Sequence, residues 1–236
     1  MATDWDETAG YYVDFRYNPS MQTSLEKKTK AELAAELLEA AIISCDLEPG
    51  SVMTETEVSE YLNLGRTPVR EALTRLANEN LVRLSRAGVV IPELNPMTML
   101  KLLEPRGMME RLCIEKAIER MVDADRARIT PVIEALHALD NSDRKGFMAQ
   151  LREIHNILAD SSKNEFILDS IKSTQGLSRR FWYYYASNED QAYCTDLYVR
   201  QMQALLTGDE TISMACSAEL MQYLQNFARQ QLEQFR

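Results

Sequence analysis

The chain has 236 residues and a mass of 27.0 kDa, which is enough for one large or two modest domains. Hydrophobic residues make up 45% and charged residues 26% of the chain, so it can bury a core and is not broadly disordered. Its 26 basic and 36 acidic side chains give a net charge of −10. As an average, this charge argues against nucleic-acid binding, because phosphate neutralisation needs basic surface. No apolar run approaches the length of a membrane span, and the N-terminus is acidic where a signal peptide is basic. We therefore expect a soluble, cytoplasmic protein that does not bind membranes.

Proline placement divides the chain into three parts. Pro92 and Pro96 bracket a short segment, and helical periodicity dominates only after it. We predict an N-terminal arm at 1–27, a small mixed domain at 28–95 and an all-helical domain at 96–236. The arm is either disordered, as termini commonly are, or docked through its aromatic side chains onto the body or a partner subunit. Those aromatic residues are Trp5, Tyr11, Tyr12, Phe15 and Tyr17. The four cysteines form no CxxC pair and are interpreted as reduced thiols.

The small domain opens with two predicted helices. Apolar residues at helical spacing predict the first over Lys28–Ser44. Thr54 and Glu57 have the spacing of a capping box, in which each side chain bonds the backbone N–H of the other residue. A second helix is therefore expected from this point to Leu62.

A third helix and a hairpin complete the small domain. A turn of three residues ending at Gly65 leads into a helix that opens at Arg66, and Pro68 suits its first turn, where amides have no intrahelical partner. The β-prone runs 81–84 and 89–91 flank a turn. Two helices joined by three residues describe a helix-turn-helix, and the hairpin makes it a winged helix.

Positive charge is concentrated within this domain. The arm and the small domain together hold 9 basic and 16 acidic residues, yet residues 66–86 hold five arginines against two glutamates. Arg66 and Arg70 are four apart, so they share one helix face and can enter a groove together. The alternative is a solvated face in which Arg70 only pairs with Glu71 or Glu79.

The run DLEPGSVMTETEVSEYLNLGRTPVREALTRLANENLV, from Asp46 to Val82, closely resembles the DNA-binding domain of the GntR family of bacterial transcription regulators. Its most specific part is GRTPVREALTRL, residues 65–76. The resemblance implies a winged helix that binds an inverted-repeat operator as a homodimer. Gly65 stands where the family usually has Ser, and the wing SRAG is shorter than usual. With the wing arginine included, the predicted DNA-binding residues are Thr56, Arg66, Thr67, Pro68, Arg70, Arg86 and Gly88.

The second domain reads as an all-α bundle of about six helices. The runs LLEPRGMMERLCIEKA and IHNILADSSKNEFIL, at residues 102–117 and 154–168, resemble the FCD effector-binding domain that accompanies one GntR subfamily. The fold class is therefore mainly α, with effector binding and dimerisation assigned to residues 96–236. The predicted helices are 97–121, 125–140, 143–160, 164–186, 190–207 and 211–235.

Many FCD domains hold a divalent metal through one Asp and three His, and this set is incomplete here. His155 falls on the first His position, Leu151 stands where Asp is expected, and Tyr198 and Tyr223 stand at the later His positions. With two histidines in the chain, the familiar ligand set cannot be assembled. We therefore expect no metal cofactor. A divalent metal at His155 would need a rearranged site using Glu153, Asp196 or Glu219.

Without a metal, arginines must orient an anionic effector. Arg106 lies where the family typically carries Arg, and Arg179 directly precedes Arg180 and five consecutive aromatic residues. Those five span more than a helical turn and cannot all face one core. A pocket of Arg and aromatic side chains suits an aromatic or hydrophobic carboxylate, whereas ordinary core and dimer packing is the alternative. Pro105 is expected to kink its helix. The predicted effector-binding residues are Arg106, His155, Arg179, Trp182, Tyr198 and Tyr223.

Together these features predict a homodimeric DNA-binding regulator, most simply a repressor, that a small carboxylate modulates. A helical hydrolase using His155 with Glu153 or Asp160 is the enzyme alternative, but the sequence offers no nucleophile elbow or phosphate loop. We therefore assign no catalytic residue and expect no enzyme. A helical module whose winged helix binds protein in place of DNA is a third class. An acyl-CoA effector also stays open, because relatives that respond to it lack the metal set.

Overall fold

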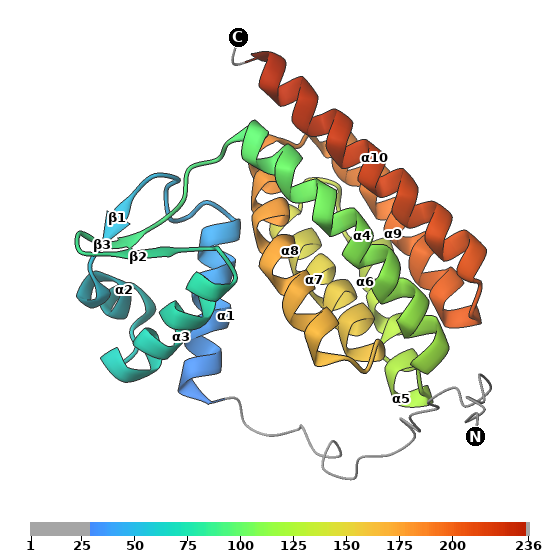
Figure 1. Ribbon diagram of the computed structural model, residues 1–236, viewed down its shortest axis with the longest axis horizontal. Coiled ribbons are helices and arrows are strands. Elements are labelled where there is room, and N and C mark those ends of the chain that lie inside the picture. Colours follow the sequence, from blue (N-terminus) through green and yellow to red (C-terminus); the bar gives the residue numbers. More distant parts are fainter. Residues whose placement is uncertain (1–28, 235–236) are drawn as a thin grey trace, which may run out of the picture.

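The computed structural model describes residues 29–234 and places them in two domains, a small one with three short strands and a larger helical one (Figure 1). The fold is mainly α, as predicted. No helix within the described range is long and apolar enough to cross a membrane. The predicted N-terminal arm and its aromatic residues lie outside the described range.

The capping residues of the small domain explain where its helices begin and end. Helix α1 (Lys30–Ile43) and helix α2 (Glu55–Leu62) each begin with a complete capping box. For α2, the Glu57 N–H donates to the Thr54 hydroxyl at 3.1 Å and the Thr54 N–H donates to the Glu57 carboxylate at 2.6 Å, which confirms the predicted pairing. Asn63 then takes a left-handed conformation that ends α2. Helix α3 (Arg66–Asn78) begins at Gly65 with no side-chain cap, as the Gly in place of Ser predicts.

The wing is a three-stranded antiparallel sheet in the order β1-β3-β2. Strands β1 (Val52–Met53), β2 (Arg83–Ser85) and β3 (Gly88–Val90) are each two or three residues long. Strand β1 precedes α2 and pairs with β3 through Val52 opposite Val90. The predicted hairpin therefore forms, with its first strand starting two residues later than the run 81–84, because Leu81 and Val82 are fully buried in the core instead.

The larger domain is a bundle of antiparallel helices. Its elements are α4 (Pro96–Arg120), α5 (Asp123–Arg126), α6 (Ile129–Ala138), α7 (Arg144–Ser161), α8 (Glu165–Tyr185), α9 (Asn188–Thr207) and α10 (Glu210–Gln234). The helix predicted over 125–140 is shorter, because the chain breaks at Ala127 and makes the single turn of α5 before it. Helix α4 continues through Pro105 without interruption. Helix α10 packs along α4 and α9, on the side of the bundle away from the small domain (Figure 1).

Each domain has its own apolar core, and the two cores meet at α1 and α8. Ile43 of α1 belongs to the core of the bundle, and Leu177 of α8 packs against the core of the winged helix. Gly176 lets α8 approach closely, since a Cβ there would lie 2.9 Å from a methyl of Leu81. Fully buried Arg180 donates to the Pro92 carbonyl at 2.6 Å. These contacts hold the winged helix against α8 in the described arrangement.

Candidate nucleic-acid interface and effector site

The first turn of α3 carries the predicted DNA-binding side chains on its outer face. Arg66, Thr67 and Arg70 are exposed, whereas Val69 is fully buried. This alternation follows from the helical repeat, because Val69 packs inward while the residues before and after it point away from the core. Pro68 is half-buried in the first turn, where no amide partner is needed. The uncapped N–H groups of this turn are free to bind a phosphate.

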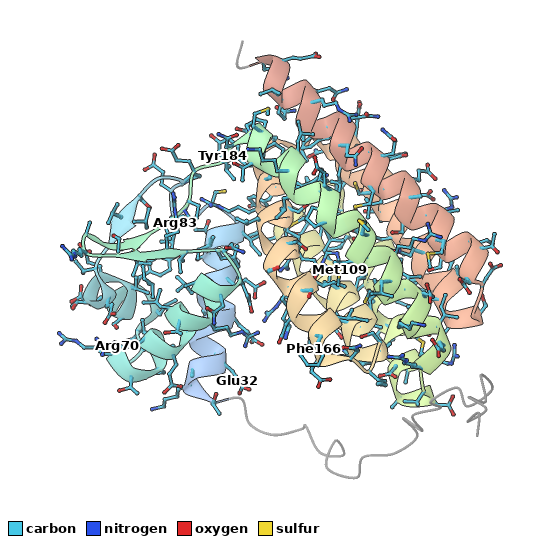
Figure 2. The ribbon with its side chains drawn as sticks, viewed as in Figure 1. Glu32, Arg70, Arg83, Met109, Phe166 and Tyr184 are labelled. Atoms are coloured by element: carbon cyan, nitrogen blue, oxygen red, sulfur yellow. The ribbon has the colours of Figure 1, made fainter. Side chains whose placement is uncertain are left out.

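Arg70 is held by a carboxylate of the preceding helix. Its guanidinium donates to one oxygen of Glu55 at 2.9 and 3.3 Å, across the turn between α2 and α3. This hydrogen bond raises the pKa of Arg70 further above its usual value. The proposed pairing of Arg70 with Glu71 or Glu79 is therefore wrong, and Arg75 takes Glu79 instead at 3.1 Å. Arg70 lies on the side of the winged helix that is remote from the helical domain (Figure 2).

The wing and α2 extend the same exposed surface. Arg83 and Arg86 are exposed and have no polar partner among residues 29–234, and Thr56 is exposed at the start of α2. Gly88 adopts φ +128°, and a Cβ there would overlap the Met53 carbonyl oxygen. Glycine is therefore required at this position by close approach of two strands.

Four of the six predicted effector residues meet inside the bundle. Arg106, Arg179, Trp182 and Tyr198 line one cavity between α4, α7, α8, α9 and α10, and each is less than one tenth exposed. The cavity has a volume of about 10 Å³, which is room for about one water molecule. The polar lining is thus brought together as predicted, but this arrangement has no space for a metabolite.

His155 and Tyr223 lie beside this cavity rather than in its lining. His155 is 2% exposed, with its ring 6.2 Å from that of Tyr198, and neither ring nitrogen has a hydrogen-bond partner in the described part of the chain. Burial, together with Arg106 and Arg179, holds the pKa of His155 well below its ordinary range, so the ring is neutral. Tyr223 instead accepts from the Trp182 indole at 3.2 Å and donates to Asp190 at 2.8 Å. It is a link between α8, α9 and α10.

Arg106 is buried in an ion pair, whereas the aromatic run is partly buried and partly exposed. Arg106 forms a buried ion pair with Glu110 at 3.3 Å, one turn later on α4. Of the five consecutive aromatic residues, Phe181 and Trp182 are buried, whereas Tyr184 is 53% exposed at the end of α8 (Figure 2). The run therefore serves both the core and the surface, as its length requires.

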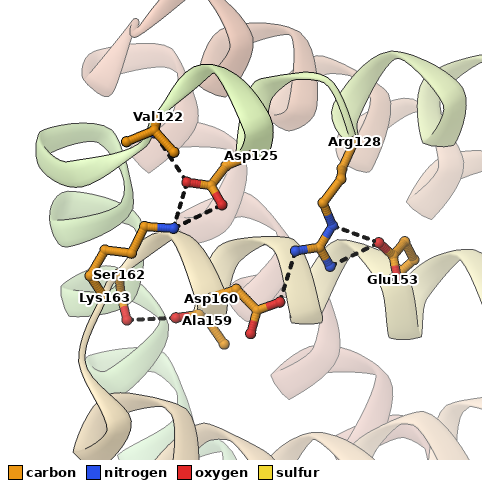
Figure 3. Close-up of polar contacts among 8 residues, drawn as sticks. All are labelled: Val122, Asp125, Arg128, Glu153, Ala159, Asp160, Ser162 and Lys163. Carbon is orange, nitrogen blue, oxygen red and sulfur yellow. Dashed lines mark hydrogen bonds and ion pairs between the residues drawn. The ribbon is translucent and has the colours of Figure 1, made fainter. Parts of the chain in front are cut away.

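The carboxylates considered for an enzyme or a metal site are occupied elsewhere. Arg128 holds both Glu153 at 2.9 Å and Asp160 at 2.8 Å on the outer side of α7, beside the Lys163–Asp125 pair (Figure 3). Asp196 and Glu219 both lie within ion-pair distance of Arg200. Within residues 29–234, no group of three or more His, Cys, Asp or Glu side chains is placed to hold a metal ion.

A second cavity, between the two domains, was not foreseen from the sequence. It has a volume of about 170 Å³ and is lined by α1 and α3 of the winged helix and by α7 and α8 of the bundle. Arg179 and His155 border it from the bundle side, and Glu39 borders it from α1. The helical periodicity of α1 places Glu39 near the buried face of that helix. No signal in the sequence links Glu39 to Arg179, which lies 140 positions later.

These features define the chain as a two-domain winged helix-turn-helix protein with a helical C-terminal domain. The family model for bacterial regulatory proteins of the gntR family matches residues 30–91, and the FCD domain model matches residues 101–223. The chain therefore belongs to the GntR family of bacterial regulators and carries an FCD domain, as its sequence resemblance implies.

Relatives in sequence are named as transcriptional regulators and not as enzymes. The gluconate operon transcriptional repressor of Bacillus licheniformis is 28% identical over 141 residues, covering 59% of this chain and 58% of that protein. The Nta operon transcriptional regulator of Aminobacter aminovorans is 31% identical over 135 residues, covering 56% and 63%. The chain thus spans about three fifths of the length of these two relatives.

Solved structures share the fold. McbR/YncC of Escherichia coli superposes with a TM-score of 0.70 at 21% identity, covering 87% of this chain and all of that one. A GntR regulator from Rhodococcus sp. RHA1 gives a TM-score of 0.62 at 20% identity over 89% of this chain and all of that one. At this identity the likeness shows the arrangement of the domains and not the ligand.

Proposed function

We propose that this protein is a DNA-binding transcription repressor whose winged helix reads an operator through the first turn of α3 and the wing. The observation that carries the proposal is the exposed face formed by Arg66, Thr67 and Arg70, of which Arg70 lies remote from the helical domain (Figure 2). Arginine at such a position suits a bidentate contact to guanine in the major groove. Arg86 and Gly88 at the wing then approach the sugar-phosphate backbone or the minor groove. The repressor role follows from the likeness to the gluconate operon relative, which is named a transcriptional repressor.

The protein acts as a homodimer on an inverted repeat. Helix α4 supports this with an exposed strip of apolar side chains at helical spacing, Met97, Met108 and Leu112, which are 47%, 77% and 38% exposed. Met108 and Leu112 follow Met97 by 11 and 15 positions, so at 3.6 residues per turn all three lie on one face of the helix. Burial of this strip against a second copy removes apolar area from water, which favours association. Two winged helices related by two-fold symmetry then match the two halves of the operator.

A small carboxylate modulates the dimer through the FCD domain. The buried guanidinium groups of Arg106 and Arg179 support this ligand class, since the planar fork of Arg matches a carboxylate. No metal takes part, because the ligand positions of the family are filled by Leu151, Tyr198 and Tyr223.

A fluorescence anisotropy titration tests the proposed function, with the DNA upstream of the protein's own gene and a scrambled duplex of equal length. We expect the upstream duplex to bind more tightly, and Arg66→Ala to weaken that binding by about 1–3 kcal/mol, the value of one good base contact. Arg229→Ala is the control and should bind as the parent does, because it removes the same charge from α10, where Arg229 donates a hydrogen bond to Asn226. Equal affinity of the parent and Arg66→Ala for the upstream duplex would contradict the proposal, and a preference for a protein partner over both duplexes would favour an interaction module.

A further inference from the structure

The cavity between the domains is the place where a ligand has both room and unsatisfied polar partners. The bundle cavity holds about 10 Å³, whereas the interdomain cavity holds about 170 Å³ and opens beside a cleft of about 560 Å³ between α1 and α7. Arg179 lines all three spaces. One guanidinium therefore faces both the predicted effector site and the winged helix.

In the described arrangement the partner of Arg179 is a carboxylate of the winged-helix domain. Glu39 of α1 accepts from Nη2 of Arg179 at 2.5 Å and lies 3.4 Å from Nε of Arg152 on α7. The side chains of Glu39 and Arg179 are 9% and 8% exposed. This pair is a buried ionic tie between the two domains.

The tie leaves hydrogen-bonding capacity unused on the bundle side. Among residues 29–234, Nε of Arg179 is buried without a partner, and so are both ring nitrogens of His155, which borders the same cavity. Glu39, which is fixed to α1, accepts from Nη2 of the guanidinium but not from Nε. A carboxylate that is free to orient can take Nε and Nη2 together, the bidentate geometry that Arg favours, and can accept from the N–H of neutral His155.

We propose that the interdomain cavity is a carboxylate-binding site in which Glu39 occupies Arg179 until the carboxylate of a small ligand replaces it. This inference rests on the proposed function for the role of the ligand as effector. When the ligand takes Arg179, the winged helix loses its buried tie to α8. Binding is thereby coupled to domain arrangement, since the ligand has affinity only for the arrangement from which Glu39 has withdrawn.

Chemical rescue tests the site without the natural effector. Propionate is the probe, because it carries the carboxylate of a glutamate side chain, and propionamide is its neutral counterpart. Glu39→Ala removes the competing carboxylate and leaves Nη2 of Arg179 available to the probe. We expect propionate to bind Glu39→Ala about 10- to 100-fold more tightly than it binds the parent, by calorimetry, as one charged hydrogen-bonded contact implies. If Glu39→Ala does not fold alone, propionate but not propionamide should restore its cooperative thermal transition.

Glu36→Ala is the matched control. Glu36 lies one turn earlier on α1, lines the same cavity and pairs with Arg152 at 3.3 Å, but does not pair with Arg179. It should respond to propionate as the parent does. An equal response of Glu36→Ala and Glu39→Ala, or an equal response to propionate and propionamide, would overturn the proposal.

Hydrogen exchange gives a second readout with a variant of nearly unchanged volume. In Glu39→Gln we expect faster amide exchange in α1 and α8, with Glu36→Gln matching the parent. Unchanged exchange in Glu39→Gln would contradict the tie between the domains. Neither experiment contains DNA, so a failure here is distinguishable from a failure of operator binding.

Discussion

Alanine in place of Gly88 tests whether the wing is built as described. The backbone at Gly88 has φ +128°, a region that residues with a Cβ rarely enter, at a cost on the order of 1–3 kcal/mol. The added Cβ would also overlap the Met53 carbonyl oxygen. To relieve this overlap, β1 must move away from β3 and weaken the pairing of Met53 with Val89. Loss of one or two ladder hydrogen bonds adds about 1–2 kcal/mol. We therefore expect Gly88→Ala to destabilise the winged helix by about 2–5 kcal/mol in total.

Gly208→Ala separates the steric part of this effect from the conformational part. Gly208 has φ +75°, but a Cβ there would meet no atom within 4 Å. Its substitution should cost only the left-handed strain of about 1–2 kcal/mol. Urea unfolding followed by circular dichroism measures the stability of both variants. Hydrogen exchange of the amides in β1 and β3 shows whether the loss of structure lies in the wing. A loss of stability in Gly88→Ala no larger than in Gly208→Ala, or strand amides as protected as in the parent, would show that the Cβ at position 88 does not disturb β1 and β3.

Three further predictions concern the helix cap, the buried histidine and metals. Gly65→Ser should stabilise the protein by a few tenths of a kcal/mol in urea unfolding, because it supplies the side-chain cap that α3 lacks; lower stability would contradict this. The pKa of folded His155 is held well below its ordinary 6.5, so the unfolded chain binds a proton that the folded chain excludes. The contribution of neutral His155 to the free energy of unfolding is therefore fully present above pH 6.5. It is lost as the pH falls toward the folded pKa, at up to about 1.4 kcal/mol per pH unit. His155→Leu should show a shallower loss of stability between pH 6.5 and 5 than the parent, and an equal slope would count against a neutral, buried ring. Addition of Zn²⁺ or EDTA should leave the thermal midpoint unchanged, whereas a rise with Zn²⁺ would indicate a metal site.

Local signals predict the winged helix well and the interdomain contacts poorly. The capping box of Thr54 and Glu57 acts through backbone groups that are near in sequence, so it can be predicted from spacing. The requirement for Gly at position 88 arises instead from the Met53 carbonyl on a neighbouring strand, which spacing alone does not identify. The alternative pairing of Arg70 with Glu71 or Glu79 is wrong, because its partner, Glu55, lies 15 positions away on another helix.

The same contrast holds in the FCD domain. Arg106, Arg179, Trp182 and Tyr198 were predicted to share a site, and they line one cavity. Its small volume follows from side-chain packing across five helices, which helical periodicity does not encode. The contact between Glu39 and Arg179 depends on how the two domains dock. Sequence patterns within either domain carry no information about that docking.

The salt dependence of DNA binding shows whether the winged helix binds an operator through its arginines. The protein carries a net charge of −10, so it should bind DNA only through the arginine-bearing face of α3 and the wing. On the DNA upstream of its own gene, we predict that the logarithm of affinity falls linearly with the logarithm of salt concentration, by about 0.9 for each phosphate contacted. Scrambled DNA should bind far more weakly at every salt concentration. Binding that does not respond to salt, or equal affinity for the two duplexes throughout, would contradict the account.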